Sequence, residues 1–278
     1  MFDGIHHVAV VVRDIEKALG FYRDVLGLPL GKRATVADQG VHAALLPAGR
    51  DEIELLEPTN PAGGVARFLE KKGEGIHHLC VETPDVAAAL DRIKAANLQV
   101  IDQAPRKGLA GTIAFLHPAA CQGILVELAQ PAEAGHPHPP SPDGIRATGI
   151  ETFFLGTKDV RAAGEHFAKH FDATVQGPDR DARLLADCMT VRIGVSRLTL
   201  LDCAQLAASP EVSRFLEGRT EGLLGLCLAV ADFEGAVGHL TRHGVPVEIR
   251  SAEAGAPLAK LPVERTHGVG VFLTPKSH

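Results

Sequence analysis

The chain has no tryptophan and one tyrosine, so it offers little aromatic surface for stacking nucleic-acid bases. Its 28 lysines and arginines are outnumbered by 34 aspartates and glutamates, and the net charge of −6 argues against a nucleic-acid-coating surface. Long apolar runs are also lacking, because the longest one near the N-terminus, Val8 to Val12, is far too short to span a bilayer. We therefore expect neither nucleic acid nor membrane as a partner.

Signatures of secretion and of disulfides are absent as well. The first residues, Met1 to Gly4, contain no basic segment and no cleavage site. The five cysteines are scattered and form no C-x-x-C motif, which favours reduced thiols in the cytoplasm. A chain of 278 residues can bury enough surface to fold without disulfides or a structural metal. We predict a cytoplasmic globular protein.

Proline concentrates in one segment near the middle of the chain. Residues 130–144 contain five prolines, a composition that excludes helix and central strand and favours extended backbone. The segment predicts a division into a domain at 1–130, a Pro-rich linker at 131–144 and a second domain at 145–278. His136 and His138 lie inside this linker, and we interpret them as solvated residues rather than as a metal-binding pair.

A repeated unit organises the rest of the sequence. Four segments each contain a short apolar strand, then an aspartate, then an amphipathic pattern typical of a helix. The four aspartates lie 71, 74 and 73 residues apart and suit the N-cap position of a helix: Asp14, Asp85, Asp159 and Asp232. Further β-type runs follow each helix. The unit therefore reads strand–helix–three strands, repeated four times.

A second match relates the two halves of the chain. Arg67-Phe68-Leu69-Glu70 recurs 147 residues later as Arg214-Phe215-Leu216-Glu217, and Glu74-Gly75 recurs at the same offset. Asp85 and Asp232 are also 147 residues apart. The pattern predicts a tandem duplication of a two-module half.

These motifs carry a family resemblance. Four stretches covering most of residues 4–130 resemble the methylmalonyl-CoA epimerase family of the vicinal oxygen chelate superfamily: residues 5–22, 53–58, 65–80 and 115–128. The resemblance implies an α+β fold in which four βαβββ modules pair into two glyoxalase-like, cup-shaped mixed sheets with helices outside. It also implies an enzyme, an isomerase with one divalent transition-metal ion held in the N-terminal half.

The resemblance places the metal ligands on His7, Glu54, His78 and Glu127. Their spacing agrees with it, because His7 and His78 each precede a capping aspartate by seven residues. Glu54 and Glu127 follow the same aspartates by 40 and 42 residues. Two imidazoles and two carboxylates suit a borderline ion such as Co, Mn, Ni, Zn or Fe, and they leave two octahedral positions for substrate oxygens.

The same offsets in the second half reach no imidazole and no carboxylate. They fall on Thr152, Thr199, Gly225 and Thr274. We therefore predict that residues 145–278 form a degenerate glyoxalase-like domain that binds no catalytic metal, and that either replaces a partner subunit or walls the active site.

Other interpretations exist for single residues. A histidine on a strand is usually a hydrogen-bonded core residue, and a glutamate within I-E-L-L can simply face solvent. His6 and His77 alternate to the opposite strand face and are interpreted as structural. Cys80 shares the face of His78, but its copy Cys227 persists where the ligands are absent, so packing explains both. His117 in F-L-H-P is expected to shape a turn before Pro118.

The implied reaction is abstraction of an α-proton from a substrate that chelates the metal through two oxygens. A 2-substituted malonyl-type acyl-CoA would offer a thioester oxygen and a carboxylate, and an epimerase needs an acid–base group on each side of C2. The resemblance assigns Glu127 to this task, and we count Glu54 as the other catalytic carboxylate. The position where some relatives carry another glutamate is Ala43 here, and His42 faces the other side unless a bulge intervenes.

Three function classes stay open. Besides the epimerase, a glyoxalase I-type lyase (lactoylglutathione lyase) uses the same His, Glu, His, Glu ligand set, although the E-L-L-E-P and F-L-E-K-K-G-E-G-I-H-H stretches favour the epimerase. An extradiol dioxygenase agrees less well with the two histidines and two glutamates, because that chemistry uses a 2-His-1-carboxylate site. The third class is a non-catalytic small-ligand-binding protein of the bleomycin-resistance type. The substrate is a small molecule, and both monomer and homodimer are compatible with the sequence.

Overall fold

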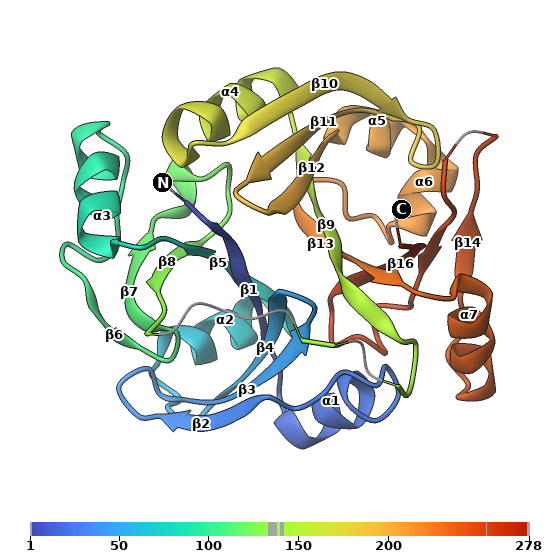
Figure 1. The fold of residues 1–278 in the computed structure, drawn as a ribbon, viewed down its shortest axis with the longest axis horizontal. Helices are drawn as coiled ribbons and strands as arrows, with labels where there is room; N and C mark the ends of the chain where they lie inside the picture. Colours follow the sequence, from blue (N-terminus) through green and yellow to red (C-terminus); the bar gives the residue numbers. More distant parts are fainter. Residues whose placement is uncertain (1, 133–137, 140–141, 254, 277–278) are drawn as a thin grey trace. The chain divides into compact units, whose positions relative to one another are not determined.

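Two mixed β-sheets dominate the fold. A computed structural model describes residues 2–132, 138–139, 142–253 and 255–276, and within these residues sixteen strands form two eight-stranded sheets (Figure 1). The strands and helices fall into four βαβββ modules, as predicted. The expected α+β class, with modules paired in two mixed sheets, is confirmed.

The first two modules supply the first sheet. Module 1 consists of β1 (Gly4–Val11), α1 (Ile15–Tyr22), β2 (Lys32–Val36), β3 (Val41–Ala48) and β4 (Asp51–Pro58). Module 2 consists of β5 (Gly75–Glu82), α3 (Val86–Ala95), β6 (Arg106–Gly108), β7 (Gly111–Leu116) and β8 (Val126–Gln130). The short helix η1 (Pro118–Ala120) lies between β7 and β8, and α2 (Gly64–Lys72) connects the modules.

The last two modules repeat this element order. Module 3 consists of β9 (Ala147–Thr157), α4 (Val160–Phe171), β10 (Thr174–Asp181), β11 (Ala186–Ile193) and β12 (Ser196–Asp202). Module 4 consists of β13 (Gly222–Val230), α7 (Phe233–Arg242), β14 (Glu248–Arg250), β15 (Leu258–Lys260) and β16 (Gly270–Pro275). Two helices, α5 (Cys203–Ala208) and α6 (Pro210–Phe215), connect these modules.

Strand order is the same in both sheets. It runs β2-β3-β4-β1-β5-β8-β7-β6 in one and β10-β11-β12-β9-β13-β16-β15-β14 in the other. Within each module the first strand pairs in parallel with the fourth, and the last three strands form antiparallel neighbours. This equivalence supports the tandem duplication, which stays a prediction.

The four repeated aspartates begin the four module helices. Asp14 accepts hydrogen bonds from the backbone N–H groups of Glu16 and Lys17, and Asp159 accepts from Arg161 and Ala162. Asp85 and Asp232 each accept from the N–H three residues later. A carboxylate there satisfies N–H groups that lack an intrahelical partner. The predicted N-caps are confirmed.

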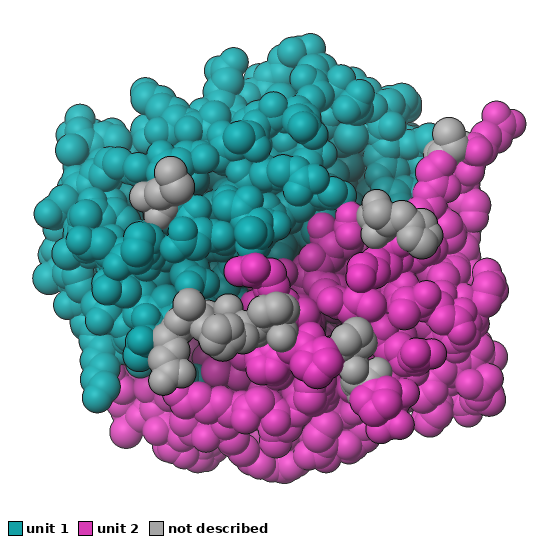
Figure 2. Space-filling model, viewed as in Figure 1, with its two compact units in different colours: residues 1–6, 78–135, 152–224 teal, residues 7–77, 136–151, 225–278 magenta. Residues whose placement is uncertain are grey.

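Two compact units divide the chain in a different way from the sheets. They are coloured separately in Figure 2 and comprise residues 1–6, 78–135 and 152–224 in unit 1, and residues 7–77, 136–151 and 225–278 in unit 2. Each unit thus combines one module that precedes the Pro-rich segment with one that follows it. The domain boundaries predicted at 130 and 145 stay a prediction.

In both units, a partly buried hydrogen bond joins the two modules. In unit 1, His166 Nε2 lies 2.8 Å from the carbonyl oxygen of Ala120. In unit 2, His239 Nε2 lies 2.9 Å from the carbonyl oxygen of Val25. These histidines occupy the same position of α4 and α7, seven residues after the capping aspartate. The repeat therefore extends to the contacts that join modules.

The Pro-rich segment is only partly described. Residues 133–137 and 140–141, including His136, lie outside the described residues. The described part of 131–144 forms neither helix nor strand, and the backbone N–H of His138 donates to the carbonyl oxygen of Gly49. Across the described residues, no helix combines the length and apolar character that crossing a membrane would require.

Candidate functional site

A buried histidine–glutamate pair lies on the parallel strands β1 and β4 of unit 2. His7 is opposite Glu52 and Ala9 is opposite Glu54 in the strand register, so His7 and Glu54 share one face of the sheet. His7 Nε2 lies 3.3 Å from Glu54 Oε2. The two residues are only 1% and 5% exposed. A carboxylate so far from water requires a partner, and the imidazole provides one.

An equivalent pair lies on the parallel strands β5 and β8 of unit 1. Cys80 is opposite Glu127, which places Glu127 on the face that also carries His78. His78 Nε2 lies 3.0 Å from Glu127 Oε2, and both residues are about as buried as the first pair, at 4% and 5% exposure. Because the first and last strands of each module carry the two residues, the pairs are equivalent in the module repeat.

The donor set suits a divalent metal ion. His7 with Glu54 in unit 2, and His78 with Glu127 in unit 1, each offer a histidine nitrogen and a carboxylate oxygen as possible metal ligands. Borderline divalent ions bind such mixed nitrogen and oxygen donors. Buried carboxylates are costly unless paired or bound to a cation, so the residues present fit such an ion.

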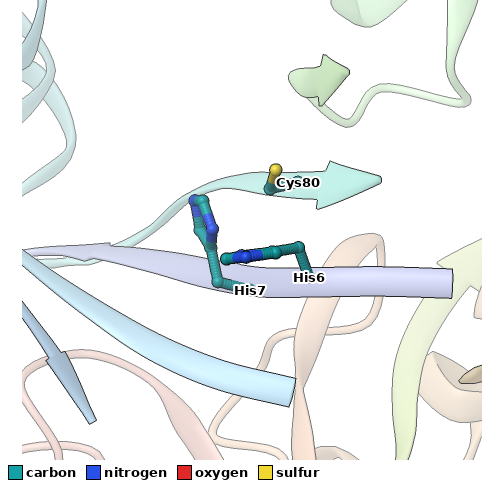
Figure 3. A group of neighbouring side chains, drawn as sticks. All are labelled: His6, His7 and Cys80. Carbon is teal, nitrogen blue, oxygen red and sulfur yellow. The ribbon is translucent and has the colours of Figure 1, made fainter. Parts of the chain in front are cut away.

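His6 and Cys80 form a further pair of possible donors, in unit 1. Their ligand atoms lie within 4.8 Å of one another. Strand alternation predicts His6 on the face opposite to His7, but Figure 3 shows its ring lying along β1 toward His7. Cys80 packs in an apolar cluster with Ile113 and Ala129, which agrees with the packing role predicted for it.

Two other predicted residues have their expected surroundings. The ring of His77 meets Phe68 of α2 edge-on, with centroids 4.9 Å apart, as expected for a structural histidine. The side chain of His117 accepts a hydrogen bond from the N–H of Ala119 and caps η1. The predicted turn before Pro118 is confirmed.

The strand β3 determines where a further acid–base group could sit. Its pairing with β4 runs without interruption from Val41 opposite Pro58 to Ala48 opposite Asp51. Ala43 is opposite Leu56 and therefore lies on the face of Glu54, whereas His42 lies on the other face, where its Nδ1 is 2.9 Å from Thr35 Oγ1. No bulge in the β3–β4 register redirects His42.

One carboxylate of this face was missed by the sequence analysis. Glu52 lies two residues before Glu54 on β4 and is the register partner of His7. Burial raises the pKa of Glu52, while the charges of His7 and His138 nearby act in the opposite direction. The signal was present in the alternation Glu52-Ile53-Glu54, which puts both carboxylates on one strand face.

An aromatic residue contacts His78 and a basic residue lies over that aromatic ring, and neither was predicted from the sequence. Phe115 of β7 meets the imidazole of His78 edge-on, with centroids 5.2 Å apart. The guanidinium of Arg106 lies over the Phe115 ring, 5.5 Å from its centroid. Asp102 holds both, because its Oδ2 accepts from Arg106 Nε and from the backbone N–H of Phe115.

The equivalent positions of the second half need one correction. Thr152 and Thr199 replace the first pair, and their hydroxyl oxygens lie 2.9 Å apart. In module 4, Cys227 is opposite Phe272 as Cys80 is opposite Glu127, so Phe272 and not Thr274 corresponds to Glu127. The segment from Cys227 to Phe272 is two residues shorter than the segment from Cys80 to Glu127, which a fixed offset does not register. Thr274 instead donates to the carbonyl oxygen of Pro257.

Comparison with known proteins identifies the class that this fold and donor set indicate. Residues 6–116 match the family model described as the glyoxalase/bleomycin resistance protein/dioxygenase superfamily. The chain belongs to this superfamily. A mutant of 4-hydroxymandelate synthase from Streptomyces coelicolor has a similar fold, with a TM-score of 0.68, 19% identity and coverage of 100% of this chain and 94% of its own. At that identity the likeness concerns the fold alone.

Within the superfamily, the N-terminal half is similar to methylmalonyl-CoA epimerases. The ethylmalonyl-CoA/methylmalonyl-CoA epimerase of Cereibacter sphaeroides is 40% identical over 133 residues, which are 47% of this chain and 99% of the relative. The mitochondrial methylmalonyl-CoA epimerase of Bos taurus is 37% identical over 128 residues, 45% of this chain and 73% of the relative. The predicted resemblance is confirmed, and both relatives are enzymes by name.

Proposed function

We propose that the chain is a metal-dependent epimerase that acts on a 2-substituted malonyl-type acyl-CoA. The observation that carries the proposal is the presence of two buried histidine–glutamate pairs at equivalent points of modules 1 and 2. The names of the relatives of the N-terminal half support the substrate class, because both act on malonyl-type CoA thioesters.

In this proposal His7, Glu54, His78 and Glu127 hold one divalent transition-metal ion. When bound, such an ion polarises two substrate oxygens and stabilises the negative charge that develops as the C2 proton leaves. The second half, with threonines, a glycine and a phenylalanine at the matching points, is assigned no catalytic metal.

The chain's own residues carry the proton. Epimerisation removes the C2 proton on one side and returns it on the other, so it requires an acid–base group for each side. Glu127 and Glu54 are carboxylates at equivalent points of two modules related by the repeat, which suits them to opposite sides of one substrate.

Metal content tests the ligand assignment. We expect about one transition-metal ion per chain by elemental analysis, lost in His78→Ala. His42→Ala is the matched control, because it removes an imidazole on the opposite face of β3 and should keep the ion and the activity. Two ions per chain would contradict the metal-free second half. An apo protein after reconstitution would favour the binding-protein interpretation.

Proton exchange tests the reaction. In D2O, the wild type should incorporate deuterium at C2 of methylmalonyl-CoA, and Glu127→Gln, compared at equal metal content, should slow this by about 10²–10⁴-fold. Full exchange activity in Glu127→Gln would overturn its assigned role. A metal-loaded wild type that isomerises the hemithioacetal of methylglyoxal and glutathione, without C2 exchange, would identify the lyase instead.

A further inference from the structure

A polar patch lies on one face of module 3, in unit 1. It is formed by residues of β11, β12 and β9, which are neighbouring strands of the second sheet (Figure 1). In the register of β11 with β12, Arg192 is opposite Arg197 and Thr190 is opposite Thr199. Thr152 of β9 shares their face, because its hydroxyl oxygen lies 2.9 Å from that of Thr199. We call these five residues the Arg–Thr patch.

The patch lies on the face of the sheet opposite to the helix α4. The residues that alternate with it along β11 are buried, among them Met189 and Val191. Gly164 of α4 approaches Met189 so closely that a Cβ added to it would lie 3.3 Å from the methyl carbon of the methionine. The patch therefore points away from α4, and both of its arginines are only partly buried and keep contact with solvent.

The patch reverses the charge found at the matching points of module 1. Thr199 of β12 matches Glu54 of β4, because β12 pairs with β9 as β4 pairs with β1. Arg197, two residues earlier, therefore matches Glu52. Arg192 is opposite Arg197, and the matching position of β3 is uncharged. Two carboxylates in module 1 thus correspond to two guanidinium groups in module 3, an exchange that favours an anion where module 1 favours a cation.

Two arginines directly opposite each other are unfavourable without a counter-ion. Side chains opposite on antiparallel strands have Cβ atoms about 4.5–5.5 Å apart, and like charges in that position destabilise a sheet. The Nε atom of Arg197 is shielded from solvent, which reduces the screening of its charge by water. In the part of the chain that the structure describes, Arg192 forms no ion pair, and the patch itself contains no carboxylate. A bound anion would remove the repulsion.

We propose that the Arg–Thr patch is a ligand site for a small dianion, which it binds through carboxylate or phosphate oxygens. Two guanidinium groups balance two negative charges, and each presents N–H donors in a planar fork that fits either kind of oxygen. The Thr190 and Thr199 hydroxyls lie two residues further along the same strands, about 7 Å away, and add donors for another oxygen of the ligand. The half of the chain without metal ligands thus acquires a binding site of its own.

Calorimetric titration of the full chain with inorganic phosphate and with malonate, in Tris chloride, tests the site. The wild type should bind at least one of the two, and tighter binding of phosphate or of malonate distinguishes a phosphate ligand from a dicarboxylate. Arg192→Gln and Arg197→Gln should each weaken binding by about tenfold or more. Arg161→Gln, at an exposed residue of α4, is the matched control and should bind as the wild type does. Binding of either anion at the candidate metal site is common to all four proteins, because no variant alters its ligands.

Thermal unfolding provides a second measurement. Without added anion, Arg192→Gln removes the like-charge pair and should melt at the wild-type temperature or above it. A saturating anion should raise the melting temperature of the wild type and of Arg161→Gln more than that of Arg192→Gln or Arg197→Gln. Equal affinity and equal stabilisation in the wild type and both patch variants would overturn the inference. Binding that disappears at about 0.15 M chloride would overturn it too, because exposed surface charge alone behaves in that way.

Discussion

The phenyl ring of Phe115 stands edge-on to the imidazole of His78, with centroids 5.2 Å apart and planes at 87°. Phe115 is itself held in place, because Asp102 accepts from its backbone N–H at 2.9 Å and the guanidinium of Arg106 lies over its ring. His78 lies 3.0 Å from Glu127 through Nε2. The contact thus orients an imidazole whose nitrogen is directed at the second carboxylate of the candidate site.

Replacing this ring should weaken metal binding without removing a ligand. We expect Phe115→Leu to lower metal affinity by about tenfold, because replacing a group that orients a metal ligand typically lowers affinity by about 10–100-fold. Competition with a chelator of known affinity measures the change. Phe68→Leu is a matched control, since Phe68 makes the same edge-on contact with His77, which is no proposed ligand. Equal affinity in the two variants would contradict the positioning role.

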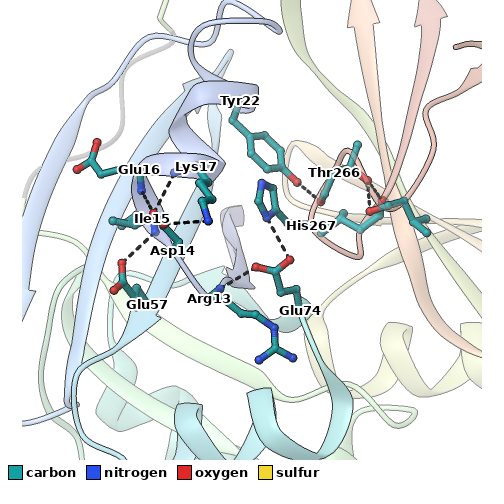
Figure 4. Close-up of polar contacts among 12 residues, drawn as sticks. Arg13, Asp14, Ile15, Glu16, Lys17, Tyr22, Glu57, Glu74, Thr266 and His267 are labelled. Atoms are coloured by element: carbon teal, nitrogen blue, oxygen red, sulfur yellow. Dashed lines mark hydrogen bonds and ion pairs between the residues drawn. The ribbon is translucent and has the colours of Figure 1, made fainter. Parts of the chain in front are cut away.

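A buried tyrosine fastens module 1 to the segment before β16 in unit 2. The hydroxyl of Tyr22 donates to the carbonyl oxygen of Thr266 at 2.8 Å, and the ring lies beside His267 (Figure 4). His267 in turn lies 3.2 Å from Glu74, whose carboxylate accepts from the N–H of Arg13 at 2.7 Å. Polar contacts thus join three segments far apart in the sequence.

Removing the tyrosine hydroxyl should destabilise the protein measurably. Tyr22 is fully buried, so Tyr22→Phe leaves the carbonyl of Thr266 without this donor and should cost about 1–2 kcal/mol of unfolding free energy. Urea unfolding monitored by circular dichroism measures the loss. Tyr22→Leu, which also removes the ring, should cost more. A Tyr22→Phe midpoint equal to that of the wild type would show that the hydrogen bond contributes nothing.

Cys121 should be unreactive in the folded protein and should make stability depend on alkaline pH. Burial raises the pKa of its thiol from 9.0 to about 12. Iodoacetamide at pH 8 should therefore modify the partly exposed Cys203 in the native protein and spare Cys121, as read by peptide mass spectrometry. Modification of native Cys121 at the rate of Cys203 would contradict this.

The raised pKa of Cys121 also predicts the direction in which stability changes with pH. Below pH 9 the thiol is protonated in both folded and unfolded chains, and the stabilisation from its raised pKa is fully present. As the pH rises toward 12 the unfolded chain releases this proton first, so stability falls by about 1.4 kcal/mol per pH unit. Cys121→Ala should lack this part of the decline. If the unfolding free energies of the wild type and Cys121→Ala changed equally between pH 8 and 11, the raised pKa of Cys121 would be refuted.

Much of the local structure follows from neighbouring residues. Asp14, Asp85, Asp159 and Asp232 were predicted as N-caps because a carboxylate there satisfies N–H groups only two or three residues away. Alternation along a strand likewise predicts that His42 and Ala43 lie on opposite faces. Such interactions span few residues, so composition and spacing suffice to predict them.

Distant pairings could not be obtained in this way. A fixed offset selected Thr274 as the counterpart of Glu127, but the register of β13 with β16 selects Phe272, because loop lengths differ between modules. The same holds for Phe115 and Arg106, whose relation to the proposed ligands depends on which strands pair and in what register. The spacing of the capping aspartates thus determined the modules and the equivalence of His7 with His78. The neighbours of each ligand were decided by long-range strand pairing. Loop lengths and packing control that pairing, and local sequence patterns do not encode it.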